Sequence, residues 1–194
     1  MLTPTLYVIA GPNGVGKTTF ADSYLPVEAK QVEFVNAGLI ARGLSPYDPD
    51  SVTIEAGRIA LKRIRELIAQ RKGFTWETTM SGRSAVGWLR EARTAGYLLK
   101  AYFLWVGDPE VALRRIRQRV VEGGHNIGEQ VSRRRFYRTI QNFLMLYRPL
   151  MDSWKLYDND LPAPRLLAVE KAGKLVVRDQ RQWSGIQEAA KIEI

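Results

Sequence analysis

Short apolar runs alternate with longer amphipathic stretches along the chain. Nearly continuous apolar character predicts buried strands at 5–10, 32–36, 73–77 and 98–106, and we expect a further strand at 165–170. Apolar residues at helical spacing predict helices between these runs, at 16–24, 49–70 and 83–95. Strands that alternate with helices are typical of a parallel sheet covered by helices. The pattern therefore predicts an α/β fold whose parallel sheet has about five strands.

Two linked helices are predicted in the second half of the chain. Asp108 can cap the first of them, Pro109 suits its first position, and Glu110 favours its positive end. Gly123-Gly124-His125 interrupts the helical spacing, which resumes over 129–147. We interpret the two helices as a hinged lid over about 108–147, and His125, the only histidine, as a packing or capping residue.

A β-hairpin is predicted near the C-terminus. Apolar residues at 166–169 and 175–177 flank the polar segment 171–174, which suits a turn. We therefore expect a hairpin at 165–178. The sequence has no internal repeat or linker, so we expect residues 1–194 to form a single domain.

Composition narrows the classes of function. Lys and Arg outnumber Asp and Glu, which gives a formal net charge of +9 and favours anionic partners. The chain has no cysteine, which excludes disulfides, thiolate metal sites and cysteine nucleophiles, and fits a cytoplasmic protein. No apolar run approaches the ~20 residues that span a bilayer, and no signal peptide is evident, so we expect no membrane association.

A phosphate-binding loop follows the first predicted strand. The motif G-x-x-x-x-G-K-[ST] is complete, and it lies between a strand and a helix as its function requires. Glycines let the backbone fold around an anion, the lysine reaches the terminal phosphates, and the threonine hydroxyl can bind Mg²⁺. The motif therefore predicts binding of ATP or GTP with magnesium. The predicted nucleotide-binding residues are Gly11, Pro12, Asn13, Gly14, Val15, Gly16, Lys17, Thr18 and Thr19.

An acidic side chain ends the third predicted strand. Ligands of such sheets bind beyond the carboxyl ends of the strands, so we expect Glu77 to hold the metal together with Thr18. Thr79 and Arg83 follow Glu77 and could continue around the site as hydrogen-bond donors. A solvated acidic residue at a strand end is the plainer alternative.

Arginines are concentrated in the two helices of the predicted lid. A basic lid can close over transferring phosphates and stabilise the charge of the transition state. A solvated surface or a nucleic-acid interface would have a similar composition, but we expect at least two of these arginines to contact nucleotide phosphates. The eight arginines are Arg114, Arg115, Arg117, Arg119, Arg133, Arg134, Arg135 and Arg138.

Together these motifs resemble the zeta-toxin family of small P-loop kinases. The ordered set comprises residues 10–21, 34–41, 76–83, 123–125, 133–135 and 156–159. The resemblance implies a kinase-type parallel sheet, ATP as donor, and a UDP-N-acetyl sugar as acceptor. It also implies an antitoxin protein as a partner. On this resemblance we expect catalytic roles for Lys17, Arg119 and Arg134, and acceptor-side roles for Asn36, Glu77, Thr79 and Arg83.

One position departs from the family pattern. After 34–37 the family has an aspartate that resembles the general base for the acceptor hydroxyl, whereas this chain has Gly38. Phosphoryl transfer depends mainly on positioning and charge stabilisation, so loss of the base need not abolish it. Loss of a general base nevertheless costs about 10²–10⁴-fold in rate. Asp48 and Asp50 follow, but no motif places them at the acceptor.

Three functions are compatible with these residues. The first is an ATP-dependent phosphotransferase that acts on a small metabolite. The second is an ATP-binding regulatory module with little transferase activity, which Gly38 favours. The third, a polynucleotide kinase, follows only from the net charge, because base-stacking aromatic residues are not evident among the lid arginines.

Overall fold

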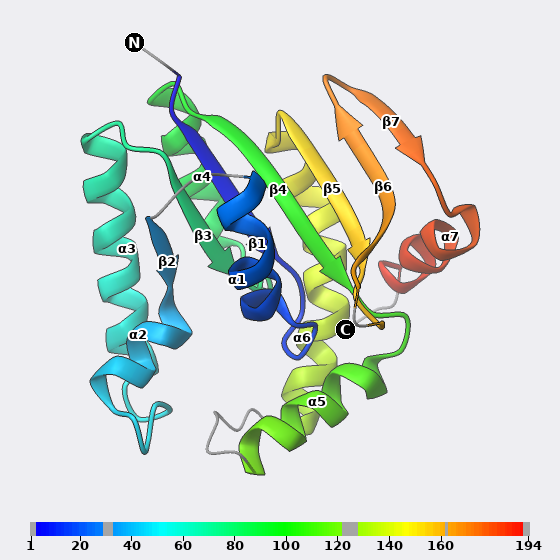
Figure 1. Cartoon of the computed structure of the whole chain (residues 1–194), viewed down its shortest axis with the longest axis horizontal. Coiled ribbons are helices and arrows are strands. Elements are labelled where there is room, and N and C mark those ends of the chain that lie inside the picture. The colour runs from blue at the N-terminus through cyan, green and yellow to red at the C-terminus, as the bar shows by residue number, and fades with distance from the viewer. Residues whose placement is uncertain (1–2, 29–32, 122–127, 162, 192–194) are drawn as a thin grey trace.

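In the computed structural model, a seven-stranded sheet carries helices on both faces (Figure 1). The structure describes residues 3–28, 33–121, 128–161 and 163–191. The strands lie in the order β2-β3-β1-β4-β5-β6-β7. Their bounds are β1 Thr5–Ala10, β2 Phe34–Asn36, β3 Phe74–Thr78, β4 Leu98–Trp105, β5 Ser153–Asp158, β6 Arg165–Lys171 and β7 Lys174–Val177.

The helices connect parallel strands as crossover units. Figure 1 shows α1 in front of the sheet, α4 and α6 behind it, and α2 and α5 at the end toward which β4 and β5 point. The helices are α1 Lys17–Glu28, α2 Ala37–Leu44, α3 Thr53–Ala69, α4 Ser84–Thr94, α5 Pro109–Val121, α6 Glu129–Asn142 and α7 Gln180–Ala189. A π-helical turn at Phe143–Tyr147 and a 3-10 turn at Arg148–Leu150 follow α6.

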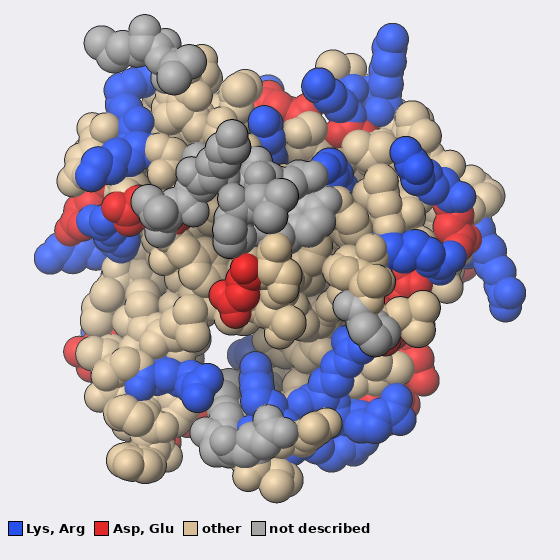
Figure 2. All heavy atoms as spheres, viewed as in Figure 1, with Lys and Arg blue, Asp and Glu red and all other residues tan. Residues whose placement is uncertain are grey.

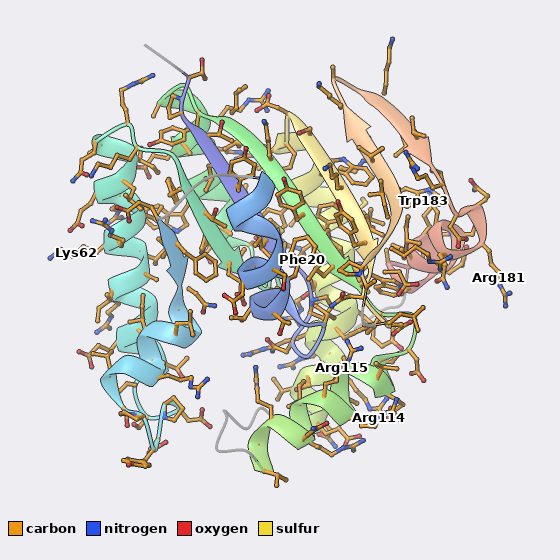
Figure 3. The ribbon with its side chains drawn as sticks, in the orientation of Figure 1. Phe20, Lys62, Arg114, Arg115, Arg181 and Trp183 are labelled. Carbon is orange, nitrogen blue, oxygen red and sulfur yellow. The ribbon has the colours of Figure 1, made fainter. Side chains whose placement is uncertain are left out.

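Successive residues of β4 build the core on opposite faces of the sheet. Tyr102 contacts Phe20 of α1, with ring centroids 5.9 Å apart, whereas Phe103 stacks on Phe143 at 4.1 Å. Figure 3 shows Phe20 on α1, over the front of the sheet. This alternation is what the strand's period of two dictates. The rigid sheet fixes the carboxyl ends of β1, β2 and β3, where the predicted site lies.

The predicted α/β fold is confirmed, although the sheet is larger than expected and mixed. Strands β1 to β5 are parallel to one another, β6 pairs antiparallel with β5, and β6 and β7 form the expected antiparallel hairpin. Three elements were absent from the prediction: α2, β5 and α7. In β5, buried Trp154 and Leu156 alternate with the half-buried Lys155. This alternation is a strand signal that was present in the sequence.

The second half of the predicted lid packs into the core. Phe136 of α6 is buried against Trp105 of β4, with ring centroids 5.2 Å apart. Ile140 and Phe143 are also fully buried. The buried part of α6 therefore does not fit a movable lid, and the interpretation of α5 as a lid stays a prediction. The proposed hinge at Gly123-Gly124-His125 lies outside the described residues, so the interpretation of His125 stays a prediction.

Candidate nucleotide site

Three glycines at positive φ shape the loop between β1 and α1. The φ angles of Gly11, Gly14 and Gly16 are 146°, 79° and 85°, values that residues with a side chain rarely adopt. A Cβ atom on Gly11 would lie 2.4 Å from the carbonyl oxygen of Leu104, and one on Gly14 would lie 2.3 Å from that of Ala112. The loop backbone therefore packs directly against β4 and α5.

Replacing Gly14 with alanine should destabilise the protein. Holding a non-glycine residue at such a φ costs about 1–3 kcal/mol, and the clash with Ala112 adds to this. We expect the free energy of unfolding, measured by urea denaturation, to fall by about 2 kcal/mol or more. Gly43→Ala is the matched control, because its Cβ would meet nothing within 4 Å. Equal losses in the two variants would contradict this account of the loop.

The loop lysine is buried beside the loop backbone. Lys17 is only 8% exposed, and its Nζ donates a hydrogen bond to the carbonyl oxygen of Pro12 at 2.9 Å. Burial lowers the pKa of Lys17, attraction to Glu77 raises it, and repulsion by Arg119 lowers it. An ammonium group has three donors. Within the described residues it makes this one hydrogen bond, so its other donors suit phosphate oxygens.

Glu77, one residue before the end of β3, links the phosphate loop to β2. Its Oε2 accepts a hydrogen bond from Thr18 Oγ1 at 3.0 Å and another from Asn36 Nδ2 at 2.7 Å. The three residues meet because β2, β3 and β1 are parallel neighbours, so their carboxyl ends share one edge. Thr18 and Glu77, the two predicted metal ligands, are thus within hydrogen-bond distance of each other.

Asn36 also begins the helix that carries Gly38. Its Oδ1 accepts hydrogen bonds from the backbone N–H groups of Gly38 and Leu39, at 2.7 and 3.2 Å, as an N-cap does. Gly38 is exposed. A Cβ atom there would meet Asn36 Oδ1 at 3.1 Å and nothing else within 4 Å among the described residues. Thr18, Asn36 and Glu77, joined by these hydrogen bonds, form the Glu77 network. The position where the resemblance predicts an aspartate therefore borders this network and faces open space.

The loop after β3 is held in place from α6 and the turn that follows it. Asn142 Nδ2 donates to the carbonyl oxygen of Met80 at 2.9 Å, and the Tyr147 hydroxyl donates to that of Gly82. A tyrosine hydroxyl is already protonated at neutral pH, and burial raises the pKa of Tyr147 to about 12, so it remains a donor in mildly alkaline solution as well. Met80 has a φ of 54°, a left-handed conformation. These bonds fix the segment that carries the predicted acceptor-side residues.

Two of the predicted acceptor-side residues, Thr79 and Arg83, lie in different surroundings. Thr79 is half-buried, and its hydroxyl lies 3.0 Å from that of Ser81 in a hydrogen bond. Arg83 is exposed and precedes α4 without a side-chain capping bond. Neither is joined by a hydrogen bond to the Glu77 network in the described part of the chain, so their assignment to the acceptor stays a prediction.

One arginine of α5 supports the phosphate loop. Arg115 donates to the carbonyl oxygens of Asn159 and Asp160, each at 3.0 Å, and Asn159 Nδ2 donates to the carbonyl oxygen of Val15 at 2.7 Å. Figure 3 places Arg115 on the side of α5 nearer the sheet and Arg114 on the outer side. Arg115 thus acts on the loop through the segment after β5 rather than on phosphate.

Two further arginines of the cluster are neutralised by glutamates. Arg117 and Arg133 lie 3.3 and 3.1 Å from carboxylate oxygens of Glu129, and Arg133 also pairs with Glu110. Glu110, which lies just before the cluster in the sequence, is thus a further counter-charge. These exposed pairs contribute little stability, but they leave less positive charge for a ligand than the composition suggests.

Arg119 interacts electrostatically with Glu77. Partial burial lowers the pKa of Arg119, Glu77 raises it, and Arg42 of α2 lowers it. The residue as a whole remains exposed, and it makes no hydrogen bond or ion pair to any described residue. Arg134 is exposed and makes no hydrogen bond or ion pair to any other described residue, so its catalytic role stays a prediction.

The basic side chains surround a hollow at this end of the molecule. Figure 2 shows the hollow between the α2 side and the α5 side, below the sheet, with Lys and Arg on its walls. The structure brings Lys17, Thr18, Asn36 and Glu77 together, with Arg119 close to them. Thr19 is exposed on α1, away from the bonds of the network.

Two residues of this site were missed by sequence reasoning. Arg42 carried no signal, because α2 was not predicted. Asn159 lay in a segment used only for the resemblance, although a polar residue directly after a strand is a signal for this edge of a parallel sheet. Among the described residues, no helix is long and apolar enough to cross a membrane.

Solved structures with this fold include nucleotide-binding proteins. The structure of AvrRxo1-ORF1:-ORF2 with ATP has a TM-score of 0.77 at 16% identity, and the match covers 99% of this chain but 65% of that one. The PezAT chromosomal toxin-antitoxin system of Streptococcus pneumoniae has a TM-score of 0.67 at 12% identity, covering 98% and 86%. A gluconokinase from Sinorhizobium meliloti 1021 has a TM-score of 0.53 at 18% identity, covering 98% and 96%. These likenesses show a P-loop kinase-like fold.

Sequence comparison gives the family. An uncharacterized protein of Haemophilus influenzae is 32% identical over 126 residues, which are 65% of this chain and 88% of that protein. A family model described as an AAA domain, AAA_33, matches residues 6–145. The matched residues contain the phosphate loop, Glu77 and the α5 arginines. This chain therefore belongs to the AAA domain family AAA_33.

Proposed function

We propose that the protein is an ATP-dependent phosphotransferase that phosphorylates a hydroxyl group of a small metabolite, with UDP-N-acetyl sugars as the first acceptors to test. The observation that carries this proposal is that Thr18 and Asn36 both donate hydrogen bonds to Glu77, beside the buried Lys17. It combines a phosphate loop with an acidic group at the adjacent strand end, as phosphoryl transfer with magnesium requires.

The residues of the site fit a magnesium ion. Mg²⁺ prefers hard oxygen ligands and binds through one or two protein side chains together with phosphates and waters. Thr18 and Glu77 supply a hydroxyl and a carboxylate within 3.0 Å of each other. Among the described residues there is no group of three or more His, Cys, Asp or Glu side chains that could hold a metal without phosphate. When bound, the ion would neutralise charge on the terminal phosphates.

Each residue then has a definite task. The loop and Lys17 hold the β- and γ-phosphates, and the side-chain amide of Asn36 orients Glu77. Arg119 lies where charge develops on the transferred group and stabilises it. The acceptor hydroxyl approaches from the α2 side, past Gly38. Because no carboxylate stands at Gly38, the acceptor proton passes to the phosphate or to water during transfer, which lowers the rate.

The direct test is transfer of labelled γ-phosphate from Mg·ATP to UDP-N-acetylglucosamine and to a panel of neutral and phosphorylated sugars. ATP binding is measured in parallel, with GTP as competitor. Transfer to a small acceptor supports the proposal. Tight ATP binding without transfer to any acceptor would favour the regulatory module, the second candidate, which the missing carboxylate at Gly38 suggests. A protein partner of the antitoxin kind stays a prediction.

Replacing Glu77 with glutamine should weaken the response to magnesium. Glutamine keeps the size of the side chain but removes the charge that would face the ion. We expect the Mg²⁺ concentration for half-maximal binding of a fluorescent ATP analogue to rise about ten- to a hundredfold. Glu188→Gln, in an exposed ion pair of α7 with Lys191, is the control. An unchanged magnesium response would exclude Glu77 from the metal site.

A further inference from the structure

The segment that follows β5 is held from two sides. The backbone N–H of Asn159 donates to the carbonyl oxygen of Trp105 at 2.8 Å, next to the pairing of β5 with β4. Oδ2 of Asp160 accepts a hydrogen bond from the backbone N–H of Gly107 at 3.0 Å. Arg115, on the side of α5 nearer the sheet (Figure 3), donates to the carbonyl oxygens of Asn159 and Asp160. The backbone that carries the Asn159 side chain is therefore tied both to the end of β4 and to α5.

The side chain of Asn159 contacts two consecutive residues of the phosphate loop. Its Nδ2 donates to the carbonyl oxygen of Val15 at 2.7 Å. The amide nitrogen is the atom that faces this carbonyl, because the amide oxygen has no proton to donate. A Cβ atom on Gly16 would lie 2.7 Å from the same Nδ2. Asn159 therefore lies directly against the peptide unit that joins Val15 to Gly16.

This peptide unit presents its two polar groups to opposite sides. The bond between Val15 and Gly16 is trans, so the Val15 carbonyl and the Gly16 N–H point in opposite directions. In a loop of this motif the backbone N–H groups bind phosphate, so the carbonyl of such a unit points away from the ligand and needs a donor elsewhere. Gly16 has no Cβ to restrict its φ. The bond from Asn159 therefore fixes a peptide unit that the glycine itself leaves free to rotate.

We propose that Asn159 is a positioning residue for the donor nucleotide, which directs the Gly16 N–H toward the phosphates by holding the Val15 carbonyl. Arg115 supports this role by fixing the backbone of Asn159. The inference rests on the nucleotide binding that is part of the proposed function. It adds to the donor site a residue that lies 144 positions after Val15, outside the phosphate-loop motif.

The test is the affinity of the protein for nucleotides. A fluorescent ATP analogue and ADP are titrated in the presence of Mg²⁺, at a temperature at which circular dichroism shows each variant to be folded. Asn159→Ala and Asn159→Leu should both bind the ATP analogue about tenfold more weakly, because leucine keeps the size of the side chain but has no donor. ADP should lose affinity equally, because the loop N–H groups hold the α- and β-phosphates. Gln187→Ala removes an exposed carboxamide from α7 and is the matched control.

A double-mutant cycle tests the role of Arg115. Arg115→Ala alone should weaken binding of the ATP analogue about three- to fivefold. Combined with Asn159→Ala it should cause no further loss, because both changes break the same series of hydrogen bonds. Losses that multiply in the double variant would show that Arg115 acts independently of Asn159.

Three outcomes would overturn the role of Asn159. These are unchanged nucleotide affinity in Asn159→Ala, normal affinity in Asn159→Leu, which would mean that size rather than the donor matters, and a loss confined to the ATP analogue, which would place the effect on the γ-phosphate. Transfer is measured in the same variants. Unchanged affinity with normal transfer refutes this inference alone. Nucleotide binding that depends on Asn159, without transfer to any acceptor, refutes the proposed function and leaves the positioning role standing.

Discussion

Replacing Gly38 with aspartate should increase the rate of phosphoryl transfer about 10²–10⁴-fold. The new carboxylate would project from the N-terminal turn of α2 into open space beside Asn36 and Glu77. Its Cβ would meet Asn36 Oδ1 at 3.1 Å, a contact that a shift of a few tenths of an ångström relieves. A negative charge is also favourable at a helix N-terminus, so we expect the variant to fold as well as the original chain.

Two controls separate base catalysis from other effects of this substitution. Gly38→Ala adds the Cβ without the carboxylate and should leave the rate nearly unchanged. Gly43→Asp adds a carboxylate to the same helix at an exposed position with open surroundings. The measurement is kcat for transfer of labelled γ-phosphate to UDP-N-acetylglucosamine. An equal gain in Gly43→Asp would point to a general charge effect, and no gain in Gly38→Asp would show that the base is not what limits this enzyme.

The sequence was sufficient for the fold class because its signals are local. Strands β1 and β4 are nearly continuous apolar runs, since helices cover both faces of the sheet there. Strand β5 carries an alternating signal that was overlooked, but its place in the sheet follows from its pairing with β4 and β6. Such pairing depends on contacts between segments far apart in the chain, which the local pattern does not report.

The site could be predicted in part for the same reason. The phosphate loop is a contiguous motif, so Lys17 and Thr18 were evident from spacing alone. The link from Glu77 to Asn36 depends on strand order, because β2 and β3 are neighbours only in the folded sheet. The arginine cluster shows that composition alone does not predict which arginines can bind a ligand. Arg115 holds backbone carbonyls and Arg133 pairs with glutamates, roles that only the fold reveals.

Arg119→Ala should lower the rate of transfer about 10³-fold while ATP affinity changes by less than about tenfold. An arginine that stabilises the charge of a transferring phosphoryl group is worth about 10³–10⁵-fold in rate. Arg119 is suited to this role because its charge is coupled to Glu77 and Lys17, yet it is unpaired among the described residues. It can therefore turn toward the phosphate without breaking an existing ion pair.

The same helix provides the control that this prediction needs. Arg114 is exposed on the outer side of α5, so Arg114→Ala removes one positive charge from the helix without touching the hollow (Figure 3). The measurement is single-turnover transfer with saturating Mg·ATP, carried out in the Gly38→Asp background to give a measurable rate. A loss of transfer rate that is confined to Arg119→Ala would show that the effect depends on the position of Arg119 in the site. Equal losses in both variants would mean that the helix acts through its overall charge. A loss of ATP affinity as large as the loss of rate would mean that Arg119 holds the ground state, because only interactions stronger in the transition state accelerate the chemical step.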